Sequence, residues 1–237
     1  MRSMLDFGFY NMDCMDGMKE FPDKYFDLAI VDPPYGIGES GKNNHTRGKL
    51  AIAKNYNPYI GNDEKSPDRN YFNELLRVSK KCIVWGGNHF ISKIPYDSSC
   101  WIVWDKQNGE TDFADCELAW TNFDTAVRIF RYRWSGMLQG NMKIKEYRIH
   151  PNQKPVALYD WILSKYANPG DKILDTHVGS ASSLIACHKN GYKYVGFELD
   201  PYYYKLAKQR LEDEENQMNF FDFPDFLPDD MKLAYTE

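Results

Sequence analysis

"DKILDTHVGSASSLIACHKNGYKYVGFELD", residues 171–200, has the pattern of a strand, a tight turn, a helix and a second strand. The first run ends at Asp175 and is followed by small residues, which allow a ligand to approach the backbone and the helix N-terminus. Glu198 ends the second run about twenty residues after the turn, where nucleotide-binding α/β folds place an acid that holds ribose hydroxyls. The segment therefore predicts an α/β fold with a ligand at this turn. A tight strand-to-helix connection without a ligand is the alternative.

Similar strand-length runs of β-branched and aromatic residues recur along the chain. Several are apolar on both faces, as parallel strands covered by helices must be. They are "FDLAIV", "KCIVWGG", "CWIVWD", "CELAW" and "AVRIF". Helical patterns lie at residues 66–80, 153–170 and 199–211, and in the last of these Asp200 is the expected N-cap. Strands that alternate with helices predict a doubly wound α/β sheet.

The length of 237 residues suits one α/β domain. We expect residues 1–212 to form that domain and residues 213–237 to form an acidic, aromatic tail. Two segments inside the domain break the alternation. Residues 36–66 are rich in Gly, Asn, Lys and Tyr and are expected to form a mobile loop that acts as a lid or binding element. Residues 121–150 are basic and aromatic and are expected to form a small insertion.

Charge is unevenly distributed along the chain. The net charge is −5, but residues 211–237 carry nine acids and one base, which leaves residues 1–210 at about +3. The segment from Trp120 to Pro155 is rich in bases, with only two acids among them. The bases are Arg128, Arg131, Arg133, Lys143, Lys145, Arg148 and Lys154. This segment favours a polyanionic partner, and an ordinary solvated surface is the alternative.

The remaining totals exclude several classes of protein. No apolar run approaches the roughly 20 residues that span a bilayer, and the N-terminus lacks a signal-peptide pattern. The five cysteines are scattered without a C-x-x-C pair. This spacing argues against a zinc ribbon, another metal site or a disulfide framework, and indicates free thiols in a reducing cytoplasm.

The run "IVDPPYGIG", residues 30–38, ends an apolar strand with a carboxylate, two prolines and an aromatic ring. The exocyclic amine of adenine or cytosine is a poor nucleophile because its lone pair is delocalised into the ring. The Asp32 carboxylate and the Pro33 carbonyl can accept its two N–H bonds, and Pro33 and Pro34 fix φ at about −65°. Tyr35 can stack on an extruded base. A proline-terminated strand with a surface tyrosine is the alternative.

These residues resemble the amino-methylating DNA methyltransferases, whose catalytic motif is [DNS]-P-P-[YFW]. Three stretches are similar to blocks of that family: "YNMDCMDGMKEFPDKYFDLAIVDPPY" (10–35), "HPNQKPVALYDWIL" (150–163) and "YKYVGFELDPYYYKLAKQRL" (192–211). The catalytic motif precedes the cofactor turn, which is the order in the β group of the family. The resemblance covers nearly all of residues 9–212 and is weak in 36–66 and 121–146.

The resemblance implies a Rossmann-like fold for methyltransferases that depend on S-adenosylmethionine (AdoMet). Such a fold has a seven-stranded, mostly parallel sheet with one antiparallel strand and helices on both faces. Asp13 matches the acid that contacts the adenine of AdoMet, and Glu198 matches the acid that holds its ribose. The family also has a turn around the methionine portion and a block that helps to hold that end. These correspond to Asp175, Gly179 and Ser180 in the turn and to Gln153 and Lys154 in the block.

The chain departs from the family at "DTHVGSAS", where "DPFxGSGT" is usual. His177 replaces an aromatic residue and can still stack on the ligand, so we count it among the cofactor-binding residues. Ala181 replaces a glycine. These departures motivate the alternative of a non-catalytic DNA-binding relative, against which the intact Asp32–Tyr35 motif argues.

The resemblance implies direct methyl transfer to a base that is flipped out of duplex DNA, with Asp32 stabilising the positive charge that develops on nitrogen. An Asp at the first motif position favours adenine N6, and cytosine N4 is the alternative. No cysteine lies in the Pro-Cys context of cytosine C5 chemistry. A methyltransferase for RNA or protein glutamine is a further alternative. An NAD-type dehydrogenase is disfavoured because G-x-G-x-x-G is missing.

We expect residues 121–150 to recognise the DNA target. The arginines of "VRIFRYRW" alternate with apolar and aromatic residues, so a strand here would turn one basic face towards phosphates or guanine edges. The expected DNA-binding residues are Arg128, Arg131, Arg133, Lys143 and Lys145. A surface strand with a charged outer face is the alternative.

The expected partners are double-stranded DNA and a second copy of the chain, because a module of this size covers little DNA alone. No nuclease motif is visible, so a restriction nuclease would be encoded separately. "QMNFF", Gln217 to Phe221, resembles the short peptides that dock on bacterial sliding clamps. Aromatic residues folded back on the protein are the alternative. We expect a cytoplasmic enzyme of bacterial or phage type without a membrane segment.

Overall fold

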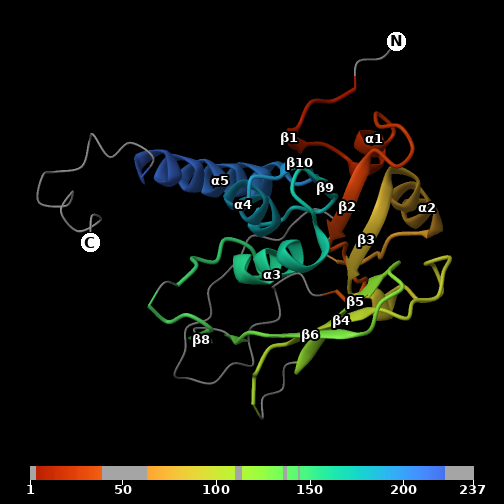
Figure 1. Ribbon diagram of the computed structural model, residues 1–237, viewed down its shortest axis with the longest axis horizontal. Helices are drawn as coiled ribbons and strands as arrows, with labels where there is room; N and C mark the ends of the chain where they lie inside the picture. Colours follow the sequence, from red (N-terminus) through yellow and green to blue (C-terminus); the bar gives the residue numbers. More distant parts are fainter. Residues whose placement is uncertain (1–3, 39–62, 110–113, 136–137, 144, 222–237) are drawn as a thin grey trace, which may run out of the picture.

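The computed structural model describes residues 4–38, 63–109, 114–135, 138–143 and 145–221, apart from the side chains of 217–221. A large sheet forms the centre of the molecule, with helices on both of its faces (Figure 1). Its strands are β1 (Gly8–Asn11), β2 (Phe26–Val31), β3 (Ser79–Trp85), β4 (Trp101–Asp105), β5 (Cys116–Thr121), β6 (Arg128–Arg131), β9 (Lys172–Asp175) and β10 (Lys193–Glu198). The helices are α1 (Cys14–Met18), α2 (Arg69–Val78), α3 (Val156–Tyr166), α4 (Ser182–Lys189) and α5 (Pro201–Phe221). A 3-10 turn (Gly87–His89) and a small hairpin of β7 (Trp134–Ser135) and β8 (Leu138–Gln139) complete the described elements.

The strand order in the large sheet is β1-β10-β9-β2-β3-β5-β4-β6. All strands run parallel except β5, which is antiparallel to both β3 and β4. The doubly wound fold with one antiparallel strand is therefore confirmed. The sheet has eight strands rather than the predicted seven, because the short edge strand β1, which none of the predicted runs covers, pairs with β10 from Gly8↔Val195 to Asn11↔Glu198.

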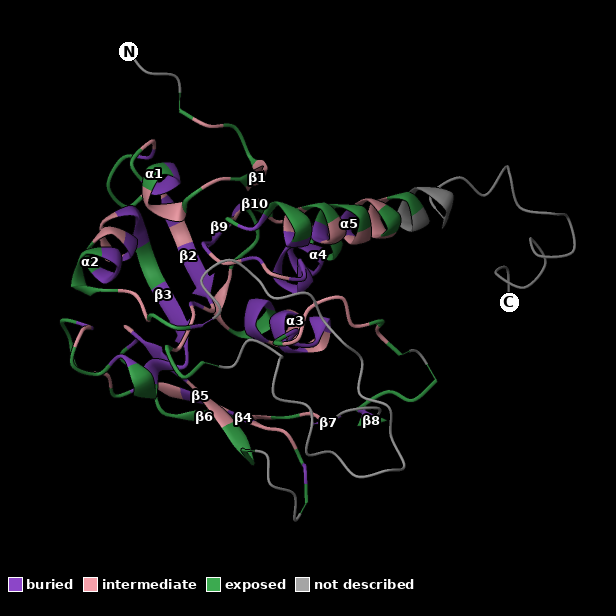
Figure 2. Cartoon of the chain, turned by 180° about the vertical axis from the view of Figure 1, so that it is seen from behind, coloured by how far each residue is buried: buried purple, intermediate pink, exposed green. Residues whose placement is uncertain are grey.

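The strands are buried on both faces, as their composition predicts. Helices α1 and α2 pack on one face, and α3, α4 and α5 pack on the other (Figure 1). Along β2, Leu28 and Ile30 point to the α3 side, whereas Ala29 and Val31 point to the α2 side. The central strands are accordingly buried throughout most of their length (Figure 2). Because the strands are buried on both faces, the positions of their carboxyl ends are fixed. Asp32 and Asp175 lie at these ends.

The connections leave β2 and β9 in opposite directions. The chain passes from β2 through α2 to β3, and from β9 through α4 to β10, while β2 and β9 pair with each other. This arrangement is a topological switch point, where open α/β sheets bind ligands beyond the carboxyl ends of the strands. Because β5 is antiparallel and Ala119 pairs with Trp85 at the end of β3, the start of β5 reaches the same edge.

Several element boundaries depend on side-chain caps. Helix α2 begins after Asp68, whose side chain accepts a hydrogen bond from the Tyr71 amide, and not at the Ser-Pro pair before it. Asp200 caps α5 as predicted, with Oδ1 2.8 Å from the Tyr202 amide nitrogen. Helix α5 continues to Phe221, so the backbone remains helical beyond the predicted domain boundary at residue 212. The side chains of Gln217–Phe221 and the whole of 222–237 lie outside the described residues.

The predicted loop at 36–66 is described only at its two ends, since 39–62 lie outside the described residues. The Asp63 carboxylate accepts hydrogen bonds from the amides of Gly36 (2.9 Å) and Ile37 (3.2 Å). Asp63 therefore ties the two ends together just after the double-proline motif.

Two classes of feature are missing from the described ranges. No helix there is long and apolar enough to cross a membrane. In the same part of the chain, no group of three His, Cys, Asp or Glu side chains is placed to hold a metal ion.

Candidate active site

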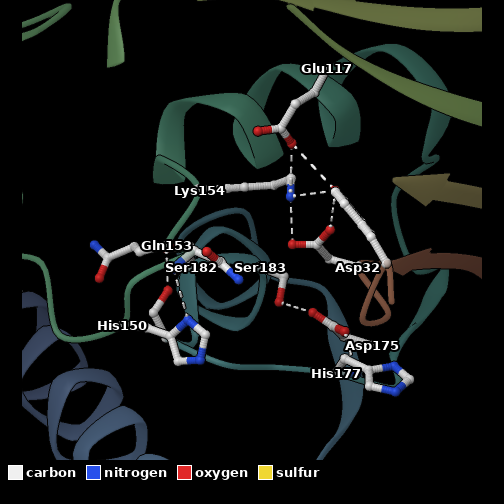
Figure 3. A network of polar contacts seen from close by, with 12 residues as sticks. Asp32, Glu117, His150, Gln153, Lys154, Asp175, His177, Ser182 and Ser183 are labelled. Atoms are coloured by element: carbon white, nitrogen blue, oxygen red, sulfur yellow. Dashed lines mark hydrogen bonds and ion pairs between the residues drawn. The ribbon is translucent and has the colours of Figure 1, made fainter. Parts of the chain in front are cut away.

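Asp32 lies directly after β2 in a mostly buried polar cluster, with 19% of its side chain exposed. Its Oδ2 accepts a hydrogen bond from Lys154 Nζ at 2.5 Å, and its Oδ1 accepts one from the Tyr35 hydroxyl at 2.8 Å. Figure 3 shows the Lys154 ammonium between the carboxylates of Asp32 and Glu117. One oxygen of Asp32 is thus held by a neighbour in the sequence, Tyr35, and the other by the distant residue Lys154.

Glu117, from the start of β5, is the second acid of the cluster. Its Oε2 lies 3.0 Å from Lys154 Nζ, and its Oε1 pairs with the ammonium of Lys106, which follows β4. The pairs form a chain of alternating charges from Asp32 through Lys154 and Glu117 to Lys106. Two carboxylates and two ammonium groups balance each other at this edge of the sheet.

Burial and pairing act in opposite directions on the pKa values of this cluster. Burial raises the pKa of Asp32 from its ordinary value, and the Lys154 ammonium opposes that effect. Burial also disfavours the charged forms of Glu117 and Lys154, but there the ion pairs prevail. They lower the pKa of Glu117 to about 2 and raise the pKa of Lys154. At neutral pH, Glu117 and Lys154 are therefore charged.

The Tyr35 ring is packed tightly beside Asp32. It stacks on His89, with ring centroids 5.0 Å apart and an interplanar angle of 16°. Gly86 has a φ of +68°, and a Cβ there would lie 2.2 Å from Tyr35 Cε1. His89 thus takes one stacking position on the ring that we expect to contact an extruded base.

A second polar cluster forms where β9 and β10 end. The Asp175 carboxylate accepts hydrogen bonds from the His177 amide (2.9 Å) and from the Ser183 hydroxyl. The Glu198 carboxylate accepts one from the Gly179 amide at 2.8 Å. Burial raises the pKa of Asp175 to about 7. Nearby carboxylates, including that of Asp32, also raise it, whereas the two hydrogen bonds lower it. The structure therefore brings Asp175, Gly179 and Glu198 together, close to Asp32.

His177 is fixed by its neighbours in this cluster. Its Nδ1 lies 2.9 Å from Thr176 Oγ1, which in turn lies 2.6 Å from the Tyr71 hydroxyl of α2. The His177 ring meets Tyr71 edge-on, with centroids 5.5 Å apart. Burial lowers the pKa of His177 to about 4, so the ring is neutral at physiological pH.

Asp13 follows β1, and Ser180 lies in the turn between β9 and α4. Asp13 caps α1 through the Met15 amide (2.7 Å) and remains exposed at the end of β1, next to β10. Ser180 is buried, with its hydroxyl 3.1 Å from that of Ser182. Between these serines, Ala181 takes a left-handed conformation with φ of +63°. The turn thus keeps the shape that the family's usual glycine favours, although a Cβ is present.

The two residues of the Gln153–Lys154 block separate in space. The buried Gln153 side chain accepts a hydrogen bond from the Ile149 amide at 2.9 Å. The backbone carbonyl of Gln153 accepts one from Trp134 Nε1 at 2.7 Å. Gln153 therefore holds the segment before α3. Lys154 forms an ion pair with Asp32, which the sequence did not predict. Periodicity and spacing could not reveal this, because the pairing depends on how α3 approaches β2. The expected contact of Lys154 with the cofactor stays a prediction.

The predicted basic face does not form within β6. This strand comprises only residues 128–131, so Arg128 and Arg131 project from opposite faces. Arg131 Nε lies 3.4 Å from Asp105 Oδ2, and Arg133 lies beyond the strand end. All three arginines are exposed, as are the predicted DNA-binding residues Lys143 and Lys145.

Sequence reasoning missed three titratable residues near these clusters. Glu117 is the only acid in the strand "CELAWT" and becomes noticeable only when that strand is placed beside β3. The Arg210 guanidinium of α5 donates to the carbonyl of Ser180 at 2.6 Å. His150 Nδ1 lies 3.9 Å from the position of a Cβ on Gly179.

Comparisons with known proteins bear on this arrangement. A family model described as "DNA methylase" matches residues 103–209, a range that contains Lys154, Asp175 and Glu198 and begins after Asp32. Over these residues the chain is similar to this family of DNA methylases. It is 25% identical to the type II methyltransferase M.HpaI of Haemophilus parainfluenzae, over 89% of this chain and 76% of that one. It is 27% identical to the DNA adenine methyltransferase YhdJ of Escherichia coli (strain K12), over 84% and 81%.

Two solved structures of DNA methylases share the fold. One is the M1.HpyAVI–SAM complex, with a TM-score of 0.54, 21% sequence identity and coverage of 85% of this chain and 98% of that chain. The other is the cytosine-N4-specific PvuII DNA methyltransferase, with a TM-score of 0.54, 14% identity and coverage of 91% and 93%. The Rossmann-like methyltransferase fold that the sequence predicts is thereby confirmed.

AdoMet is the methyl donor of this family of DNA methylases, and the residues at the β9–β10 edge fit it. AdoMet carries ribose hydroxyls, an adenine amine and a positive sulfonium. The carboxylates of Asp13, Asp175 and Glu198 offer acceptors for the first two and negative charge for the third. Burial raises the pKa of Asp175, and no cation of the described residues contributes to lowering it. Gly179 leaves the backbone open, since the nearest described atom to a Cβ there is His150 Nδ1 at 3.9 Å.

Proposed function

We propose that this DNA methylase transfers a methyl group from AdoMet to the exocyclic N6 amine of an adenine flipped out of duplex DNA. The observation that carries the proposal is the position of Asp32 at the end of β2, beside the Asp175 turn at the end of β9. An acid placed to hold an amine therefore lies across the topological switch point from acids that suit AdoMet.

The cofactor-binding part of the proposal assigns each residue a contact. Asp13 and Glu198 would accept hydrogen bonds from the adenine amine and the ribose hydroxyls, and Asp175 would face the positive charge. Gly179 and Ser180 form the turn through which the backbone approaches the ligand. When bound, AdoMet supplies a methyl group on a positively charged sulfur, which is already activated for transfer.

The catalytic part of the proposal rests on acceptors for the amine. Asp32 accepts one N–H of the base and the Pro33 carbonyl accepts the other, so the nitrogen lone pair points out of the base plane towards the methyl carbon. Transfer of the methyl group would leave a neutral thioether on the cofactor and positive charge on the base nitrogen, which the Asp32 carboxylate would stabilise. The nitrogen would then release one proton to solvent, which restores a neutral base. Tyr35 would pack against the base.

The choice of base is the finer part of the proposal. Adenine is favoured by Asp32 at the first position of the motif and by the similarity to YhdJ, a DNA adenine methyltransferase. Cytosine N4 is the second candidate, because the cytosine-N4-specific PvuII enzyme shares the fold. Both amines present two N–H bonds to the same pair of acceptors.

The proposal also covers partners and location. Duplex DNA would contact the exposed basic side chains of Arg128, Arg131, Arg133, Lys143 and Lys145. A homodimer would extend the DNA contact, and docking of Gln217–Phe221 on a sliding clamp would bring the enzyme to replicated DNA. Such an enzyme would work in the bacterial cytoplasm, where its substrate lies.

Methylation-aware sequencing of DNA from cells that express the chain tests the proposed function. We expect N6-methyladenine in a defined sequence context with the wild type and with Asp16→Ala, which alters an exposed acid on α1. We expect no such marks with Asp32→Ala. N4-methylcytosine in place of N6-methyladenine would support the second candidate. Identical marks with wild type and Asp32→Ala would contradict the role of Asp32.

A further inference from the structure

We propose that Lys154 and Glu117 are positioning residues for methyl transfer: Glu117 holds the Lys154 ammonium, and Lys154 keeps the Asp32 carboxylate oriented and negatively charged. This inference rests on the proposed function and deepens it at the same site. It assigns to Lys154 a role at the reacting base, where the resemblance implied a contact with the cofactor.

The Lys154 ammonium is fully engaged in the described structure. It is only 5% exposed, and each of its three N–H bonds has an acceptor within reach. The acceptors are Asp32 Oδ2 at 2.5 Å, Glu117 Oε2 at 3.0 Å and the Tyr35 hydroxyl at 3.3 Å. The rings of Tyr35 and Trp85 lie 5.7 Å and 5.6 Å from the charge. A side chain with all its donors used and with rings around it has one preferred position.

This position determines how Asp32 meets a substrate. Lys154 engages Oδ2 of Asp32 and Tyr35 engages Oδ1, so the carboxylate plane is fixed from both sides. Each carboxylate oxygen has two lone pairs, and one on each oxygen remains to accept an amine N–H. Orientation of the acceptor before the base arrives is the main protein contribution to such a transfer.

Lys154 also determines the charge of Asp32. Without it, the carboxylates of Asp32 and Glu117 would lie in one poorly solvated cluster and would repel each other. Two acids in that situation retain one proton between them at neutral pH. A protonated Asp32 could not stabilise positive charge on the amine. Lys106, which pairs with the other oxygen of Glu117, keeps that acid ionised and prevents it from competing for the proton.

Other titratable groups face Asp32 from the elements packed around it, and none of them can replace Lys154. Tyr35 follows the same strand, Tyr159 lies on α3 and Asp175 ends β9. The neutral Tyr35 hydroxyl donates a hydrogen bond that lowers the pKa of Asp32, but it brings no positive charge. The ionised forms of Tyr159 and Asp175 are negative, so neither can take the place of the ammonium. His89 reaches the cluster only through its stacking on Tyr35. In the described part of the site, Lys154 is the cation in direct contact with Asp32.

The experiment compares Lys154→Met, Lys154→Arg and Glu117→Gln with the wild type. For each protein, the pH dependence of kcat/KM for methyl transfer to DNA is measured, together with AdoMet affinity by calorimetry. A carboxyl ¹³C NMR titration of the cofactor-free protein, with the Asp32 signal assigned through Asp32→Asn, reports the pKa of Asp32 without turnover.

The expected shifts have opposite signs. Lys154→Met should move the acid limb of the profile and the Asp32 titration upward by more than about one pH unit, with kcat falling more than tenfold at pH 7. Lys154→Arg should restore most of the wild-type profile, because the charge is kept. Glu117→Gln should move the Asp32 titration downward, because a negative neighbour is removed. AdoMet affinity should change by less than about threefold in all three variants.

The contrary results are equally distinct. An unchanged Asp32 titration in Lys154→Met would overturn the inference, and so would a loss of AdoMet affinity greater than tenfold, which would return Lys154 to the cofactor. If Lys154→Met does not fold, the Asp32 titration in Glu117→Gln tests the inference instead. A downward shift would support it, and an unchanged titration would contradict it. A wild-type protein that methylates no DNA would refute the proposed function, while the NMR titration would still test Lys154 separately.

Discussion

Arg210 Nη2 lies 2.7 Å from Glu146 Oε2, in a mostly buried ion pair that joins helix α5 to the segment before α3. Arg210 also donates to the Ser180 carbonyl at 2.6 Å. The other oxygen of Glu146 accepts the amide of Val156, the first residue of α3, at 2.9 Å. One ion pair thus connects α5, the start of α3 and the turn at which we place AdoMet.

We predict that Arg210→Met destabilises the protein and weakens AdoMet binding together. The substitution leaves Glu146 buried without its cation, which costs about 3–5 kcal/mol when a buried pair is broken. It also frees the Ser180 carbonyl, so the turn loses a fixed neighbour. Urea denaturation gives the free energy of unfolding, and calorimetry on the folded protein gives the AdoMet affinity.

Lys208→Met is the matched control for Arg210→Met. Lys208 is a cation on the same helix, is about half exposed, and lies 4.0 Å from Glu212. Its loss should change the free energy of unfolding by less than about 0.5 kcal/mol, as is usual for exposed pairs. Equal effects of the two substitutions would contradict the structural role of the buried pair.

Gly86 is the residue on which the packing of the Tyr35 ring depends most directly. A Cβ at this position would lie 2.2 Å from the ring, so Gly86→Ala must displace Tyr35. We predict a fall in kcat/KM for methyl transfer of at least tenfold, because the hydroxyl of Tyr35 would no longer fix Asp32. Steady-state assays with a methylatable duplex measure this effect.

Gly109→Ala separates that contact from backbone strain. Gly109 has the same φ of +68°, and no atom of the described residues lies within 4 Å of its Cβ position. Both substitutions therefore incur the cost of a left-handed alanine, roughly 1 kcal/mol or more, and only Gly86→Ala meets the ring. A loss of activity as large in Gly109→Ala would show that strain, and not the displaced tyrosine, is responsible.

The fold could be predicted from the sequence because its signals are local. Runs such as "FDLAIV" are apolar on both faces, and this pattern requires a sheet covered by helices on both sides. Asp200 caps α5 as expected, since a cap depends only on the following turn. The edge strand β1 is absent from the predicted runs because it spans four residues and none of them is buried. Its pairing with β10 is a tertiary property.

Only those residues of the site that lie at the end of a strand could be predicted from the sequence. Asp32 follows β2 directly and Asp175 is the last residue of β9, so identifying the strands was enough to place them. Glu117 and Lys106 reach the site through the antiparallel β5 and the strand beside it, a topology that residue patterns do not reveal. The position of Lys154 depends on the approach of α3. Long-range ion pairs of this kind leave no periodic trace in the sequence.

Asp175 should make both stability and AdoMet binding depend on pH. Its pKa is about 7 in the folded protein, well above the usual value for an unfolded chain. The folded state therefore holds the proton more tightly, and stability falls as pH rises from about 4 to about 7 and then stays level. A bound sulfonium favours the carboxylate, so AdoMet affinity should rise over the upper part of that window. Calorimetry and thermal melts at pH 5.5 and 8 measure both effects.

Asp175→Asn tests the assignment of that pH dependence. Because asparagine carries no charge to bury, the variant should be more stable than the wild type at pH 8, by at most about 4 kcal/mol. The difference should vanish near pH 4. Its AdoMet affinity should be weaker than that of the wild type at pH 8 and should no longer vary with pH between 5.5 and 8. An unchanged pH dependence of affinity in the variant would assign the effect to another group.

Lys143 and Lys145 should contribute to DNA affinity through phosphates and not through base identity. Both are exposed on the segment after β8. A lysine that neutralises one phosphate contributes about −0.9 to the slope of log K against log salt. Replacing both by alanine should therefore reduce the slope by about 2 and weaken all duplexes equally. Lys80→Ala with Lys165→Ala removes two exposed lysines placed elsewhere and should leave the slope unchanged. Fluorescence anisotropy across a salt series measures it, and a loss confined to one DNA sequence would instead assign base readout to these lysines.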